Sequence, residues 1–116
     1  MKSTRLHVSG RDIGVLVSIT ETTRERMRGL LGRDGLPHGE ALLLKHCRSI
    51  HTFGMRFAID VLFLDRHQRI VAIHHDVPRR RMLLNLRAMQ TLEMTAGVAR
   101  QHELHVGAPL AFEATR

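Results

Sequence analysis

The chain has 116 residues, of which 43% are hydrophobic and 25% are charged. These are ordinary values for a globular protein, so they exclude a disordered tail or a collagen-like chain, and the length fits a single domain over residues 1–116. Eighteen lysines and arginines against eleven aspartates and glutamates give a formal net charge of +7, carried almost entirely by arginine.

The first predicted element is a β-hairpin. Apolar residues alternate with polar ones over residues 4–8 and again over residues 13–19, and turn-forming residues 9–12 separate the two runs. Alternation of this kind is typical of strands that bury one face. We therefore expect two antiparallel strands at the start of the chain.

A short helix is predicted next, over residues 22–31. Thr22 and Glu25 have the spacing of a capping box, in which each side chain binds the backbone N–H of the other residue. Three apolar residues follow at helical spacing and would form one buried stripe: Met27, Leu30 and Leu31. Gly32 would end the helix, and residues 33–39 predict a loop.

The remainder of the chain is rich in strand-like segments. We expect strands at residues 41–45, 57–64, 69–74, 91–94, 103–106 and 110–113. Residues 75–88 have no clear period. The predicted fold class is mainly β (α+β), a single compact domain with a curled antiparallel or mixed sheet or partly open barrel of six to eight short strands and one short helix. A doubly wound α/β fold is excluded because the helices between strands are missing.

Two carboxylates stand out because the pattern places them among apolar residues. Asp60 lies inside the strand-like run 57–64, and Glu93 lies inside the run 91–94. Burial of an unpaired carboxylate is costly, so each should have a partner. The partner is either structural, such as a loop amide or the guanidinium of Arg26, or it is a bound ligand or substrate. The sequence leaves both interpretations open.

The segment 46–56 concentrates residues that can bind metals or react as nucleophiles. Four of its side chains are metal-ligand types: His46, Cys47, His51 and Met55. Their spacing matches no zinc motif, and His102 and His105 would point to opposite faces of a strand. We therefore predict no metal and no cofactor. Cys47 with His51 as its base is a possible nucleophile, but a strand cysteine is more often an inert buried residue.

Arginines are concentrated at two places. Residues 79–81 are three consecutive arginines, and the predicted helix contributes Arg24, Arg26 and Arg28. Such a surface could attract anionic polymers. Single-strand binders interleave their basic residues with aromatic side chains, however, and this chain has four phenylalanines and no Trp or Tyr. We therefore do not expect a nucleic acid partner.

The compartment is predicted from two features. No stretch of the chain is apolar for long enough to span a membrane, and the first residues lack the apolar core of a signal peptide. A single cysteine gives no reason to expect an oxidising compartment. These features predict a cytoplasmic protein with no membrane span.

Three segments together resemble a known family. The order and spacing of residues 26–32, 50–65 and 92–97 resemble the bacterial and archaeal family catalogued as domain of unknown function 192, over about residues 17–112. Ala58 and Thr95 stand where the family often has proline. The resemblance implies a compact, mainly β domain with a short helix. It carries over no catalytic residue, because the family has no established activity.

Five residues inside these motifs form the predicted site: Arg26, His51, Met55, Asp60 and Glu93. Because they include no recognisable nucleophile or cofactor loop, they favour a non-catalytic domain that binds a small polar ligand or a protein partner, rather than an enzyme. Two alternatives stay open. One is a small hydrolase in which His51 acts as the base and Asp60 or Glu93 orients it. The other is binding of anionic polymers by the arginine-rich surface.

Overall fold

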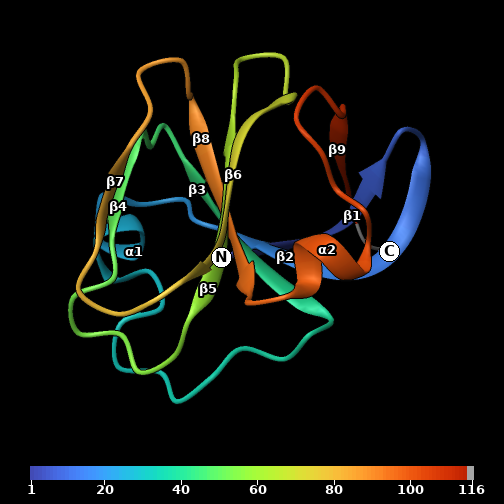
Figure 1. The fold of residues 1–116 in the computed structure, drawn as a ribbon. Helices are drawn as coiled ribbons and strands as arrows, with labels where there is room; N and C mark the ends of the chain where they lie inside the picture. The colour runs from blue at the N-terminus through green and yellow to red at the C-terminus, as the bar shows by residue number, and fades with distance from the viewer. Residues whose placement is uncertain (115–116) are drawn as a thin grey trace.

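A computed structural model describes residues 1–114, and Figure 1 shows it as a ribbon. Helix α1 spans Thr23–Arg28 and helix α2 spans Val98–Gln101. The strands are β1 (Lys2–Val8), β2 (Arg11–Ile19), β3 (Glu40–Lys45), β4 (Ser49–His51), β5 (Ile59–Leu64), β6 (Ile70–Val77), β7 (Met82–Leu84), β8 (Gln90–Thr95) and β9 (Leu110–Ala114). The mainly β fold class is confirmed.

Most strands belong to one curled sheet that forms a half-barrel. Its seven strands have the order β6-β5-β8-β3-β2-β1-β9, which agrees with the predicted six to eight. Strands β2 and β3 are parallel, and the other neighbouring pairs are antiparallel, so the sheet is mixed. Strands β4 and β7 form a separate two-stranded sheet, which lies with α1 at one side of the molecule (Figure 1).

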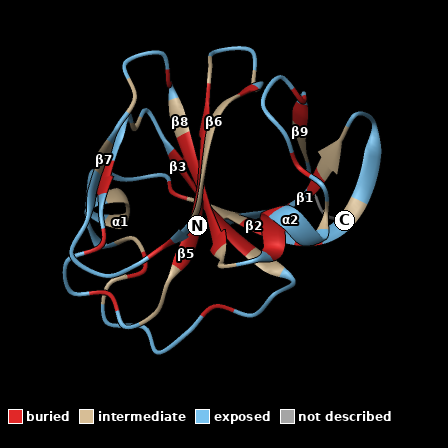
Figure 2. Cartoon of the chain, in the orientation of Figure 1, coloured by how far each residue is buried: buried red, intermediate tan, exposed pale blue. Residues whose placement is uncertain are grey.

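The residues of the central strands β3, β5 and β8 are mostly buried (Figure 2). Every residue of β5 is buried, and because neighbours along a strand point to opposite faces, this strand contributes to two cores. Leu62 and Leu92 belong to the core that also includes Val98 of α2. Phe63 and Leu42 belong to the core on the opposite face, which is covered by Leu30 and by strand β4. The sheet therefore separates two environments.

The N-terminal hairpin and the capping box are confirmed. Strand β1 pairs with β2 in antiparallel register. The Thr22 hydroxyl accepts the N–H of Glu25 at 3.1 Å, and the Glu25 carboxylate accepts the N–H of Thr22 at 3.0 Å. Neither helix is long and apolar enough to cross a membrane in the described part of the chain.

The predicted end of the first helix was wrong. Helix α1 stops at Arg28, with Gly29 rather than Gly32 as the capping residue, because Gly29 adopts a positive φ of 49°. The chain after Gly29 leaves helical spacing, so the expected stripe is broken. Leu30 is buried, whereas Met27 is 74% exposed.

The predicted strand at residues 103–106 was also wrong. This segment follows the short helix α2, which the sequence pattern did not indicate, and it forms turns. Its backbone bonds are local, since Leu104 donates to the carbonyl of Ala99 and Ala108 donates to that of His105. The segment without a clear period, residues 75–88, contains the end of β6 and all of β7.

Candidate functional site

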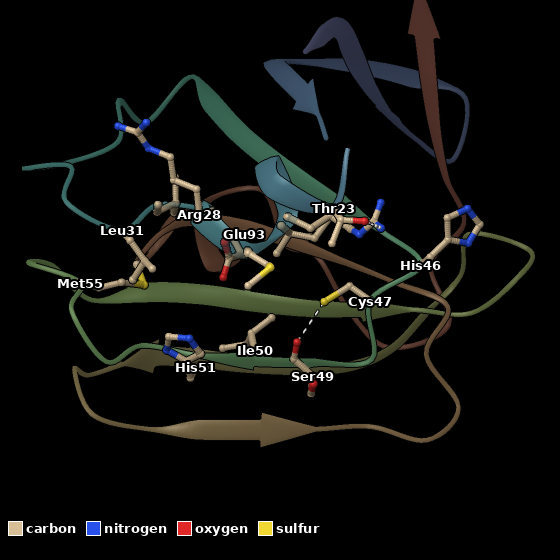
Figure 3. Close-up of a pocket in the computed structure, with 15 residues that line it drawn as sticks. Thr23, Arg28, Leu31, His46, Cys47, Ser49, Ile50, His51, Met55 and Glu93 are labelled. Atoms are coloured by element: carbon tan, nitrogen blue, oxygen red, sulfur yellow. Dashed lines mark hydrogen bonds between the residues drawn. The ribbon is translucent and has the colours of Figure 1, made fainter. Parts of the chain in front are cut away.

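A pocket of about 300 Å³ lies between helix α1, strand β4 and the central sheet (Figure 3). This volume is at the lower end of the range of small-molecule sites, about 300–1,000 Å³. Its wall is formed mostly by apolar side chains from α1 and the residues after it, from β3 and from the segment around β4. They are Met27, Leu30, Leu31, Leu44, Ile50 and Met55.

Glu93 is the one acidic side chain that lines this pocket. It lies in β8 opposite Leu42 of β3 and Val61 of β5, and this register turns its side chain to the face covered by α1. Glu93 is only 3% exposed. Burial raises the pKa of its carboxyl group to about 7. The carboxyl group therefore loses its charge far more easily than an exposed glutamate would.

No partner compensates for the burial of Glu93. Within residues 1–114, no hydrogen bond and no ion pair reaches its carboxyl group. The helix end lies close to the carboxyl group, because a β-carbon placed on Gly29 would be in van der Waals contact with Oε1 of Glu93, at 3.9 Å. Figure 3 shows Glu93 among the pocket residues, with Leu31 and Met55 on one side and Cys47 and His46 on the other.

Four basic side chains also line the pocket: Arg26, Arg28, His46 and His51. The guanidinium of Arg26 donates to the hydroxyl of Thr23 at 3.0 Å and does not pair with Glu93. His51 is exposed on β4, with its ring centre 6.1 Å from that of Phe53. The pocket thus combines an apolar wall, a basic rim and one buried acid.

Cys47 lies at the wall of the pocket and does not have the environment of a nucleophile. It is half-buried, and its thiol donates to the carbonyl of Ser49 at 2.9 Å (Figure 3). Burial raises the pKa of the thiol above its ordinary value, so the reactive thiolate is disfavoured. Within residues 1–114, no three His, Cys, Asp or Glu side chains gather in a group that could hold a metal ion.

Asp60 lies outside this pocket, on the opposite face of the sheet. It is fully buried opposite Met94 and accepts three backbone N–H groups, from Asp76 at 2.9 Å, Gly97 at 3.0 Å and Ala99 at 3.0 Å. Two of these N–H groups belong to the first turn of α2 and its capping residue. The carboxylate of Asp60 therefore joins β5 to β6 and caps α2.

The structure thus gathers four of the five predicted site residues in one pocket, namely Arg26, His51, Met55 and Glu93. The apolar wall was not predicted from the sequence, since Leu44 and Ile50 look like ordinary core residues. The sequence pattern also could not separate Asp60 from Glu93. Both are single acids in apolar strands, and only the pairing of the strands assigns them to different faces.

Comparison with known proteins gives a family and a fold. The sequence profile of the family DUF192, described as uncharacterized ACR, matches residues 4–112, which confirms the predicted resemblance. No curated protein matches the chain.

Two crystal structures have the same fold. A protein from Sinorhizobium meliloti 1021, described as a candidate transcription regulator, has a TM-score of 0.85 and 18% identity, over 95% of this chain and 93% of that chain. A protein of unknown function from Novosphingobium aromaticivorans DSM 12444 has a TM-score of 0.80 and 17% identity, over 94% of this chain and 84% of that chain. Identities this low show a shared fold alone.

Proposed function

The chain belongs to the family known as domain of unknown function 192, whose description names no activity, and from the pocket itself we propose that the protein binds a small molecule beneath helix α1. One observation carries the proposal. Glu93 is buried in an apolar pocket with no partner for its carboxyl group among the described residues. Its carboxyl oxygens are not sealed from solvent, since the described side-chain atoms that are both sealed and without a partner are Thr4 Oγ1 and His75 Nδ1, so a ligand in the pocket can reach the carboxyl group.

A ligand would supply the hydrogen-bond partner that the carboxyl group of Glu93 lacks. Because the pKa of Glu93 is about 7, the acid and the carboxylate are both accessible near neutral pH. The acid can donate one hydrogen bond and accept others, and the carboxylate can only accept. The rest of the pocket wall is mostly apolar, so the ligand has a largely apolar body with a polar group that reaches Glu93.

Binding fits the geometry better than hydrolysis does. A catalytic base needs a second group that orients it, and no hydrogen bond joins His51 to Glu93 in residues 1–114. Asp60 is occupied by three N–H groups on the other face of the sheet. We propose that this function is performed in the cytoplasm. The free Cys47 agrees with that location.

The test uses the neutral fluorescent probe N-phenyl-1-naphthylamine and an NMR titration of the isotope-labelled protein. We expect saturable binding of one probe molecule, with amide shifts confined to the pocket, including Ile50, Cys47 and Glu93. The amides of Gly97 and Ala99, on the far face, should not move. Shifts centred on α2, or shifts that rise without saturation, would reject the proposed site.

A pair of variants gives a second test. Ile50→Trp fills the pocket, because Ile50 is 8% exposed and lines it, whereas Met82→Trp adds the same bulk at a 76% exposed position outside it. Ile50→Trp should abolish probe binding and Met82→Trp should leave it intact. A thermal melt of each variant shows whether lost probe binding comes from a filled pocket or from a protein that fails to fold. The NMR titration of the unmodified chain tests the site without either variant.

A further inference from the structure

We infer that the ligand of this pocket is an amphipathic anion, and that its carboxylate or phosphate group is bound in a basic groove beside the pocket. The inference rests on the proposed function, because it names the class of molecule that the same site takes. It is carried by the position of the groove, by its charge and by the absence of ion pairs there.

The groove lies where strands β1, β2 and β3 approach helix α1. It has a volume of about 360 Å³ and is lined by Lys2, Ile19, Thr20, Glu21, Arg26, Lys45 and His46. Arg26 and His46 line both the groove and the apolar pocket, so the two are adjacent. One molecule can therefore occupy both, with its apolar body against the apolar wall of the pocket and its charged end in the groove.

The cations of the groove are free of acidic partners. Lys2, Arg26 and Lys45 form no ion pair with any carboxylate in residues 1–114. Glu21 is the single acid that lines the groove. The nearby Glu25 is already engaged, since it binds the N-terminal amine at 3.4 Å and accepts the backbone N–H groups of residues 21 and 22. The groove therefore has an excess of unpaired cations, which carboxylates and phosphates complement.

The backbone places His46 at the boundary between the groove and the pocket. His46 directly follows β3 and has a φ of +54°, in the left-handed region that residues other than glycine seldom adopt. The strand end is fixed by Thr20, whose hydroxyl donates to the carbonyl of Leu43 at 3.1 Å and accepts the N–H of Lys45 at 3.3 Å.

An anion in the groove also fits the state of Glu93. A second negative charge nearby disfavours the ionised carboxyl group further, so Glu93 stays protonated and donates a hydrogen bond to the ligand. The other titratable or charged groups that face the pocket are Arg26, Arg28, His46, Cys47 and His51. Affinity for an anion should therefore fall as the pH rises above about 7.

The experiment compares four molecules with the same eight-carbon chain and different ends, namely octanoate, octyl phosphate, octanol and octylamine. Each competes with N-phenyl-1-naphthylamine for the full-length protein at pH 6.5. We expect octanoate or octyl phosphate to bind about tenfold more tightly than octanol and octylamine, since one charge-assisted hydrogen bond is worth about this factor.

Two charge variants localise the anion. Lys45→Gln should lower the affinity for the more tightly bound anion about tenfold and leave the affinity for octanol unchanged. Lys45 is exposed in the groove, so its loss removes a charge without disturbing the core. Arg24→Gln removes an equal charge from an exposed position of α1 that lines neither cavity, and it should change nothing.

The outcomes separate the inference from the proposed function. Equal affinities for the four molecules, strongest binding of octylamine, or an unchanged octanoate affinity in Lys45→Gln would overturn the anion site while the apolar pocket stands. Binding to vesicles of anionic lipid without binding of free octanoate or octyl phosphate would likewise overturn it. No competition by any of the four, together with no saturable probe binding, would reject both.

Discussion

Asp60 and Glu93 lie on neighbouring strands and are both almost fully buried, yet their surroundings are opposite. Three backbone N–H groups point at the carboxylate of Asp60. None points at the carboxyl group of Glu93 in the described residues, and its pKa is raised to about 7. A satisfied acid holds the fold together, and an unsatisfied acid in a pocket is available to a ligand.

The first prediction concerns the pH dependence of Glu93→Gln. The folded protein holds a proton on Glu93 up to about pH 7, whereas the unfolded chain releases it near the ordinary value of 4.5. The stability of the original chain should therefore fall between these two pH values, by up to about 3 kcal/mol at pH 8. Glutamine resembles the protonated acid, so the variant should lack this fall.

Urea denaturation of both proteins at pH 5 and pH 8 measures the effect. The difference between them isolates Glu93, because every other residue is the same in both proteins. We expect similar stabilities at pH 5 and a more stable variant at pH 8. A difference that does not change with pH would contradict the raised pKa.

At the scale of elements, both helices depend on side chains from elsewhere in the fold. Helices of six and four residues do not form alone in water, since nucleation costs more than so few hydrogen bonds return. Helix α1 has its own capping box and anchors to the core through Leu30. Helix α2 has no cap from its own N-terminal residue Gly97 and takes one from Asp60.

The second prediction is a large loss of stability in Asp60→Ala. The change leaves three N–H groups without an acceptor inside the protein, two of them at α2. We expect the free energy of unfolding to fall by about 3–5 kcal/mol, measured by urea denaturation. Asp34→Ala is the matched control, because the carboxylate of Asp34 is 89% exposed and bound to Arg56 at 2.6 Å. The control should cost less than about 1 kcal/mol. A comparable loss in both variants would refute the capping role of Asp60.

At the scale of the whole molecule, the two sides of the pocket differ in how extensively they are packed and paired. Its floor is the central sheet, in which β5 is buried along its whole length between β6 and β8. Its cover is the six-residue helix α1 and the two-stranded sheet of β4 and β7, which pair over three residues. A rigid floor and a lightly held cover let a ligand enter without unfolding of the core.

The third prediction follows from this difference and is measured by hydrogen exchange. Amides of β5, β8 and β3 should exchange most slowly, at rates set by global unfolding, whereas α1 and the pair β4–β7 should exchange through local opening. Saturating N-phenyl-1-naphthylamine should slow exchange in α1 and β4 and leave α2 unchanged. If α1 and β4 exchanged as slowly as β5 without any ligand, the cover would not be the mobile part.

The local features of the fold can be predicted from the sequence alone. Three such features depend on residues close together in the chain, namely the hairpin, the capping box at Thr22 and the strand-rich composition. Their patterns can therefore be recognised without a structure. The presence of two acids in apolar strands could be recognised for the same reason. So could the family, because its motif segments are contiguous.

Only the tertiary structure shows which of the two acids supports the fold and which lines the pocket. The register that pairs Asp60 with Met94 and Val61 with Glu93 turns the two acids to opposite faces of one sheet. Helix α1 ends at Gly29 rather than at Gly32, although both glycines adopt a positive φ, so the sequence pattern does not distinguish them. Register and burial depend on contacts between residues far apart in the chain. A local pattern therefore identifies a buried acid, but only the fold shows whether backbone amides or an open pocket lie in front of it.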